Sequence, residues 1–180
     1  MPRVLVPLAQ GCEELEAVTI IDLLRRADIE VITAGLENGP VTGSRGVNLL
    51  PDMTLEEALR LDYDMVALPG GIPGSDHLAA DGRLTELLQR MHDSGRFVAA
   101  VCAAPKVLAR LGILADKQAT AFPGVLQAEL HPDITGKAVT RDGHVITSRS
   151  VGTVMDFALA LVEALLGHEN RVSLEQTLQR

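Results

Sequence analysis

The chain has 180 residues, of which 47% are hydrophobic and 22% are charged, and this balance is typical of a globular protein rather than a disordered one. Its formal net charge is −8, which disfavours nucleic acid as a partner and favours a small molecule or another protein. No apolar stretch has the length of a membrane span or a signal-peptide core, and the two cysteines, Cys12 and Cys102, are expected to be free thiols in a reducing compartment. We therefore expect a cytoplasmic protein in which residues 1–180 make a single domain.

Strand-like and helix-like segments alternate through the first half of the chain. In chain order, the residues predict a strand over 3–9, a helix over 13–28, a strand over 30–35, two short strands over 40–52, a helix over 54–61 and a strand over 64–71. The two short strands flank a Gly-Ser-Arg-Gly turn. Thr54 and Glu57 have the spacing of a capping box, which favours the start of a helix there.

The second half continues the alternation. It predicts a helix over 81–95, a strand over 97–101, a helix over 104–112, a hairpin over 138–148 and helices over 152–167 and 173–179. Pro105 falls in the first turn of its helix, where a missing N–H costs nothing, and residues 113–136 show no regular pattern. This order predicts an α/β fold with a mostly parallel sheet, helices on both faces and a small antiparallel hairpin.

Three strand-to-loop junctions carry residues that could do chemistry. They are "AQGCEELE" after the first strand, "LPGGIPG" after the strand over 64–71, and "VCAAP" after the strand over 97–101. Ligands of open α/β sheets bind outside the carboxyl ends of the strands. We therefore expect these loops to meet at one edge of the sheet.

Cys102 lies where an apolar strand stops and a helix begins. Ala100 and Ala104 supply the small residues that a tight nucleophile elbow requires on either side, and the positive end of the following helix would favour the thiolate. Gly70 and Gly71 could turn backbone N–H groups toward a ligand and form an oxyanion hole with the N–H of Ala103. The alternatives are a small apolar side chain at the end of a buried strand and an ordinary tight turn.

Three glutamates, Glu13, Glu14 and Glu16, begin the first helix. Acidic side chains there complement the helix dipole and cap free N–H groups. One of the three could instead point inward, remain partly protonated and share a proton with a thiol. The pattern does not indicate which one.

Several stretches match a known family in the same order along nearly the whole chain. They are "GCEELEAV" (11–18), "DLLRRADIEV" (22–31), "SRGV" (44–47), "DMVALPGGIPG" (64–74), "FVAAVCAAPKVLA" (97–109), "TSRSVGT" (147–153) and "DFALALVEALLG" (156–167). Together they resemble the DJ-1/PfpI (ThiJ) superfamily, and within it the DJ-1 branch. The resemblance implies a flavodoxin-like α/β sandwich that forms homodimers and needs no cofactor. The sequence has no CxxC, HExxH or Walker-type motif, so it does not indicate a metal site.

The resemblance also assigns residues. It implies that Cys102 is the reactive thiol and Glu16 its partner carboxyl, with backbone N–H groups from Gly71 and Ala103. It places Gly70 and Arg45 at the substrate, Arg45 reaching over from the other subunit of the dimer. The second cysteine, Cys12, could resolve an oxidised Cys102 as a disulfide, although a buried structural side chain is the favoured interpretation.

Two positions depart from the family pattern. Phe122 stands where many members have a histidine, and Val151 stands where proline is common. The five histidines, at positions 77, 92, 131, 144 and 168, are expected to be surface residues, with His77 nearest to the site. The pattern therefore argues against a Cys-His hydrolase.

The resemblance implies a cofactor-free glyoxalase III or deglycase activity on methylglyoxal, glyoxal or their adducts on glycated proteins. The alternative is a protein that responds to oxidative stress. Its cysteine would be oxidised to a sulfinate held by protonated Glu16, and its output would be chaperone-like protection or partner binding.

Overall fold

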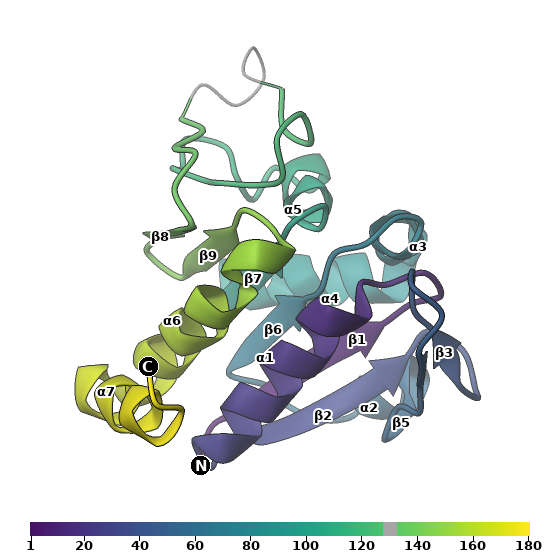
Figure 1. Cartoon of the computed structure of the whole chain (residues 1–180). Coiled ribbons are helices and arrows are strands. Elements are labelled where there is room, and N and C mark those ends of the chain that lie inside the picture. Colours follow the sequence, from purple (N-terminus) through teal and green to yellow (C-terminus); the bar gives the residue numbers. More distant parts are fainter. Residues whose placement is uncertain (128–132) are drawn as a thin grey trace.

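The computed structural model describes residues 1–127 and 133–180. Its main sheet has seven strands in the order β5-β2-β1-β6-β7-β9-β8 (Figure 1). These strands are β1 (Arg3–Leu8), β2 (Glu30–Gly35), β5 (Met53–Thr54), β6 (Met65–Leu68), β7 (Phe97–Val101), β8 (Val139–Asp142) and β9 (Val145–Ser148). All neighbours pair in parallel except β8 and β9, which form the predicted hairpin. A separate antiparallel pair, β3 (Val41–Thr42) and β4 (Asn48–Leu49), confirms the two short strands predicted within 40–52.

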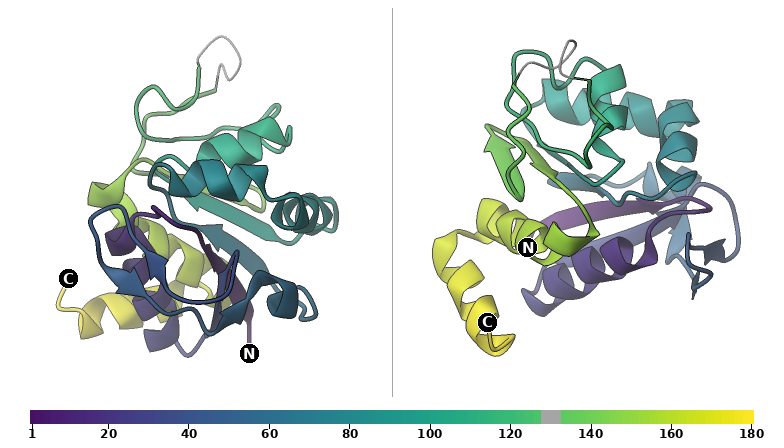
Figure 2. Two further views of the ribbon diagram at one scale, coloured as in Figure 1. Left: turned by 90° about the vertical axis from the view of Figure 1, so that its right-hand side faces the viewer. Right: turned by 45° about the horizontal axis from the view of Figure 1, so that its top comes forward.

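Helices cover both faces of the sheet (Figures 1 and 2). They are α1 (Glu14–Arg26), α2 (Leu55–Ala58), α3 (Gly74–Ala80), α4 (Gly82–Asp93), α5 (Pro105–Arg110), α6 (Val154–Leu166) and α7 (His168–Thr177), with a 3-10 turn at Val151–Thr153 before α6. The core has two layers. Leu5 of β1 packs with α2 to α5 on one face, while Val4 and Val6 of the same strand pack with α1 and α6 on the other. This alternation along β1 follows from the period of two in a strand.

The predicted α/β class and layered architecture are confirmed, with differences at short elements. Helix α3 was not predicted, because its seven residues begin with Gly74 and follow Pro73 without a side-chain cap. Strand β5 has two residues and exists through its pairing with β2. Helix α7 begins five residues before the predicted 173, directly after Gly167, whose φ of 89° separates it from α6. The capping box at Thr54 and Glu57 is present.

No helix in the described part of the chain combines the length and the apolar character that a membrane span requires.

Candidate active site

Cys102 adopts the strained backbone that an elbow between strand and helix requires. It follows β7 with a φ of 61°, a left-handed value that few residues other than glycine adopt. Its N–H donates to the carbonyl of Ser148 over 3.0 Å, and its carbonyl accepts from the N–H of Phe122 over 2.9 Å. These two bonds hold the turn from both sides, and no sequence pattern indicated either partner. The Cys102 side chain is left partly exposed.

Glu16 is the buried acid of the site. It lies in the first turn of α1 with none of its surface exposed, and its Oε2 accepts the N–H of Gly70 over 2.8 Å. Its Oε1 is buried without a hydrogen-bond partner among the described residues. Burial raises the pKa of Glu16 to about 7, although the Gly70 N–H and the neighbouring Cys102 thiol act in the opposite direction. Near neutral pH this carboxyl therefore exists in both protonation states.

Gly70 lies between the acid and the thiol. A Cβ at this position would fall 2.7 Å from Glu16 Oε2, 2.8 Å from the Cβ of Cys102 and 2.9 Å from the Val101 carbonyl oxygen. Any larger residue would therefore have to displace one of them. Glycine at position 70 is what lets the carboxyl and the thiol occupy the same small space.

Cys102 is a thiol rather than a preformed thiolate when Glu16 is ionised. Burial and the adjacent Glu16 charge raise the pKa of Cys102 to about 12, while the N–H groups of Ala103 and Gly71 act to lower it. The N–H of Ala103, at the start of α5, thus acts in the expected direction and favours the thiolate, but burial and the Glu16 charge outweigh it. Helix α5 has six residues, and its dipole does not offset desolvation and a negative neighbour.

The other two glutamates have structural roles. Glu13 caps α1 through the N–H of Leu15 and accepts the hydroxyl of Ser44 over 2.8 Å. Glu14 Oε1 accepts the N–H groups of Arg45, over 2.8 Å, and Val47, over 3.2 Å. Burial raises the pKa of Glu14, but these hydrogen bonds outweigh it and the net shift is downward. The structure thus separates three acids that the sequence pattern left equivalent.

Arg45 is exposed in the turn between β3 and β4. Its backbone N–H is tied to Glu14, but within the described residues its guanidinium makes no hydrogen bond or ion pair with this chain. The single chain does not bring the Arg45 side chain to Cys102. Its approach from a second subunit stays a prediction.

No histidine in residues 1–127 and 133–180 hydrogen-bonds to Cys102 or Glu16. His77 contacts the Gln10 carbonyl, His92 and His144 pair with each other, and His168 lies near Glu163. The remaining histidine, His131, lies outside the described residues. Phe122 is half-exposed and is tied to the site through its backbone. Within the described residues, no three His, Cys, Asp or Glu side chains are arranged to hold a metal ion.

Cys12 supports the site through its backbone. Its carbonyl accepts the N–H of Ser44 over 2.7 Å, and a Cβ on Gly74 would collide with its backbone. Its side chain is fully buried, and burial followed by the charges of Glu14 and Glu13 raises the pKa of the thiol to about 11. Cys12 and Cys102 are both free, and the disulfide between them stays a prediction.

Comparison with known proteins agrees with this architecture. The model of the DJ-1/PfpI family matches residues 2–164. The chain is 41% identical over 177 residues to protein DJ-1 homolog B of Arabidopsis thaliana, covering 97% of this chain but only 40% of that longer protein. It is 33% identical over 171 residues to the glutathione-independent glyoxalase DJR-1.2 of Caenorhabditis elegans, covering 94% and 91% of the two chains. Among solved structures, oxidized Toxoplasma gondii DJ-1 superposes with a TM-score of 0.93 and 34% identity over 99% of this chain and 98% of that one. The chain belongs to the DJ-1/PfpI family.

Proposed function

We propose that the protein is a glutathione-independent glyoxalase that converts methylglyoxal or glyoxal to a hydroxy acid. The observation that carries the proposal is the buried Glu16 carboxyl, which has a pKa of about 7 and lies next to the Cys102 thiol because Gly70 has no side chain between them. An acid that is half ionised at neutral pH serves well as both proton acceptor and proton donor.

The first step is addition of the thiol to the aldehyde. Glu16 takes the Cys102 proton as the sulfur bonds to the aldehyde carbon, which gives a hemithioacetal with a negative oxygen. The N–H groups of Gly71 and Ala103 already face the sulfur, so they are the donors nearest to that oxygen. Protonated Glu16 then returns its proton to the oxygen.

The remaining steps move two protons and add one water. Glu16 removes the hydrogen from the former aldehyde carbon, giving an enediolate, and delivers it to the neighbouring carbon. The hydroxyl proton on the former aldehyde oxygen moves to the neighbouring oxygen, so that the first carbon becomes the carbonyl of a thioester. The product is a hydroxy thioester on Cys102. Water cleaves this ester, releasing lactate from methylglyoxal or glycolate from glyoxal and restoring the thiol. The net reaction adds one water to the dicarbonyl and needs no oxidant or cofactor.

Adducts of the same dicarbonyls on proteins are a second proposed substrate class. Such deglycase action would use the same thiol addition and the same acid. Of the two substrate classes, the relative named as a glutathione-independent glyoxalase supports the free dicarbonyls rather than their protein adducts. We propose the cytoplasm as the location, because both cysteines are free thiols.

A redox-responsive role is the second candidate, and the unpartnered Glu16 Oε1 favours it. Two equivalents of hydrogen peroxide would convert the Cys102 thiol to a sulfinic acid with release of two waters. Protonated Glu16 would donate a hydrogen bond to the sulfinate. The raised pKa of Cys102 opposes this chemistry, since the thiolate is the form that peroxide attacks.

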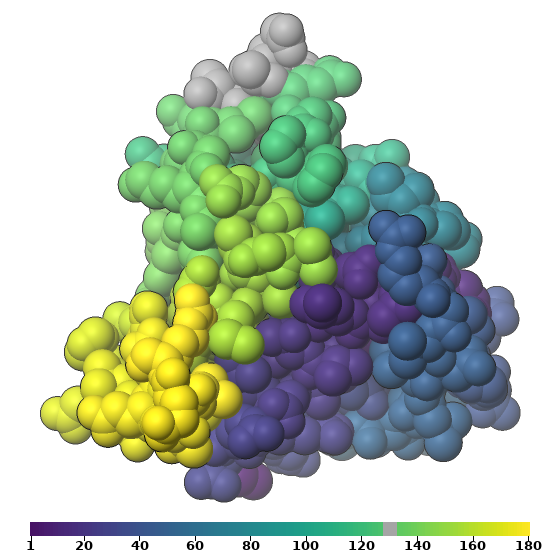
Figure 3. Space-filling view, in the orientation of Figure 1, coloured from purple at the N-terminus to yellow at the C-terminus, as the bar shows by residue number. Residues whose placement is uncertain are grey.

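We also propose a homodimer formed through α1 and α6. Exposed apolar side chains gather on these neighbouring helices and their flanks, namely Leu15, Val18, Val47, Val151 and Met155. Figure 3 views the molecule from this side and shows the two helices next to each other at the surface. Apolar side chains grouped in this way mark an interaction surface.

The test of the enzyme proposal is lactate formation from methylglyoxal without glutathione. Wild type is compared with Cys102→Ser and with Glu16→Gln, a variant that keeps the acceptor for the Gly70 N–H but cannot carry a proton. We expect saturable production that both substitutions reduce by about a hundredfold or more. Equal rates in all three proteins would overturn the proposal.

A further inference from the structure

The chain has three asparagines, at positions 38, 48 and 170, and the structure holds two of them firmly. Asn48 lies in β4, and its Oδ1 accepts the hydroxyl of Thr42 over 2.8 Å. Asn170 lies in α7, and its Nδ2 donates to the Leu166 carbonyl over 2.8 Å. Both side-chain amides are therefore fixed by a partner within or next to a regular element.

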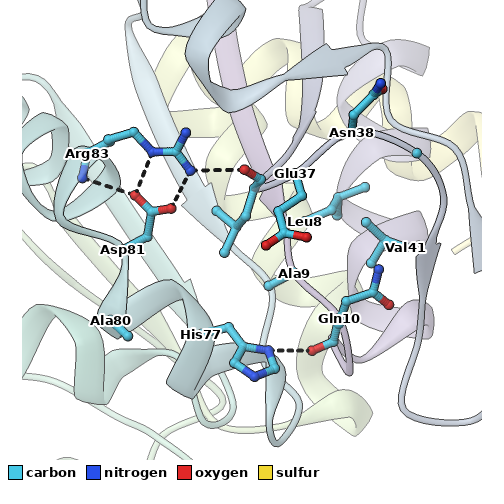
Figure 4. A pocket seen from close by; sticks show the side chains of 12 residues that line it. Leu8, Ala9, Gln10, Glu37, Asn38, Val41, His77, Ala80, Asp81 and Arg83 are labelled. Carbon is cyan, nitrogen blue, oxygen red and sulfur yellow. Dashed lines mark hydrogen bonds and ion pairs between the residues drawn. The ribbon is translucent and has the colours of Figure 1, made fainter.

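Asn38 lies outside the regular elements. It is exposed in the connection between β2 and β3. Figure 4 shows it at the edge of a pocket, with its side chain directed away from Glu37. Within residues 1–127 and 133–180, the Asn38 side chain makes no hydrogen bond, and Figure 4 draws no interaction to it. Its amide group is therefore free to change rotamer.

The residue after Asn38 is a glycine in open space. Gly39 has a φ of 99°, and a Cβ added to it would meet no atom within 4 Å. Its N–H donates no hydrogen bond to any part of the chain that the structure describes. Because glycine changes its backbone dihedrals more easily than other residues, the Gly39 nitrogen can approach the Cγ of Asn38.

The residues that follow the other two asparagines lack this freedom. Leu49 carries a branched side chain next to its nitrogen and belongs to β4. Arg171 belongs to α7, and its N–H is directed to the Gly167 carbonyl. Neither nitrogen is as accessible as that of Gly39.

A backbone nitrogen with this freedom reacts with the side-chain amide before it. The nitrogen loses its proton and bonds to the asparagine Cγ, and the side-chain nitrogen leaves as ammonia, which closes a five-membered succinimide. Water then opens the ring at one of its two carbonyls. One opening gives aspartate, and the other gives isoaspartate, in which the main chain runs through the former side chain. The sum is one water consumed and one ammonia released, with no oxidant or cofactor.

We propose that Asn38 is a site of spontaneous deamidation in the folded protein. The attack requires a mobile amide and an unbonded N–H that can come within bonding reach of it. Of the three asparagines, all of which the structure describes, Asn38 is the one that combines both. The product carries one more negative charge than the −8 of the sequence, directly after Glu37. The site is independent of the glyoxalase proposal, because it uses neither Cys102 nor Glu16.

The test follows the side-chain NH₂ signals of the ¹⁵N-labelled full chain by NMR during incubation at pH 8 and 37 °C. We expect the Asn38 signals to disappear at least about tenfold faster than those of Asn48 and Asn170. Peptide mapping should then show two separable new forms of the peptide that contains residue 38, each heavier by about one mass unit. At pH 6 the loss should be slower by about tenfold or more, because the attacking nitrogen must give up its proton.

Matched variants complete the test. Asn38→Gln keeps a side-chain amide but would have to close a six-membered ring, so its signals should persist over the same period. Gly39→Ala places a Cβ beside the attacking nitrogen and should slow the loss by about tenfold. The control is Gly46→Ala, which changes another glycine with a positive φ, 91°, and nothing within 4 Å of an added Cβ; it should deamidate at the wild-type rate. The ¹⁵N spectrum shows that each variant is folded. Persistent Asn38 signals in wild type, equal loss from all three asparagines, or an unchanged rate in Gly39→Ala would overturn the proposal.

Discussion

The chemistry of the site depends on where one proton sits between Cys102 and Glu16. Burial raises the pKa of both groups, so the pair resists carrying two negative charges. At neutral pH the reactive arrangement is a thiol beside an ionised carboxyl. Attack on an aldehyde therefore needs transfer of the thiol proton to Glu16 rather than a standing thiolate.

This arrangement predicts how activity depends on pH. Glu16 must be ionised to accept the proton, and its pKa is about 7. We expect kcat/KM for methylglyoxal to rise about tenfold per pH unit below pH 7 and to level off above it. Initial rates between pH 5.5 and 8.5 check this, and a profile that is flat across the range would contradict the role of Glu16.

The same shift predicts a pH dependence of stability. The folded-state pKa of Glu16 is raised from 4.5 to about 7. The contribution of protonated Glu16 to the free energy of unfolding is therefore complete below pH 4.5 and is lost as the pH rises through 7. The total effect is roughly 3 kcal/mol in the free energy of unfolding. Urea unfolding should show that the free energy of unfolding falls less between pH 5 and pH 8 in Glu16→Gln than in wild type. An identical fall in the two proteins would contradict the raised pKa of Glu16.

Gly70 offers a steric test of the contact between acid and thiol. Gly70→Ala places a methyl group against Glu16 Oε2, the Cys102 Cβ and the Val101 carbonyl. We expect a loss of about 1–3 kcal/mol in unfolding free energy and a fall in activity of about tenfold or more. The matched control is Gly82→Ala, whose added Cβ meets nothing within 4 Å. If both variants behave like wild type, the site is not packed as described.

At the scale of elements, the Glu14 carboxylate ties the β3–β4 hairpin to α1, together with the bonds from Ser44 to Glu13 and to the Cys12 carbonyl. Glu14 accepts the N–H groups of Arg45 and Val47, and Gly43 leaves the room that the carboxylate needs. Glu14→Ala should therefore speed hydrogen exchange of the Arg45 and Val47 amides by about tenfold, through loss of a buried partner. Glu86→Ala on α4 is the control. Unchanged exchange in Glu14→Ala would show that other contacts hold the hairpin.

The long amphipathic elements were predictable from sequence because their periodicity covers several turns, as in α1 and α6. Helix α3 was not, since seven residues that start at a glycine give too short a pattern. The small residues around Cys102 indicated the elbow. The different roles of Glu13, Glu14 and Glu16 depend on which residues each side chain contacts, and the pKa of the Cys102 thiol depends on its burial. Contacts and burial arise from tertiary packing rather than from local sequence.

At the scale of the whole molecule, the face formed by α1 and α6 predicts the oligomeric state. The exposed Val18 lies on α1, and Val18→Asp would bury a charge in the proposed interface at high cost. Light scattering after size exclusion should give twice the chain mass for wild type and a single chain mass for Val18→Asp. Ser94→Asp, an exposed change at the end of α4, should remain dimeric. A monomeric wild type would contradict the dimer.

The most direct test of the central claim follows ¹³C-labelled methylglyoxal by NMR in the presence of the purified protein, with no glutathione. Turnover through Cys102 and Glu16 predicts lactate in many-fold excess over protein, and no lactate with Cys102→Ser. Loss of the aldehyde that stops at about one equivalent per thiol, with no lactate resonance, would show that Cys102 only traps the dicarbonyl and would contradict the proposed enzyme.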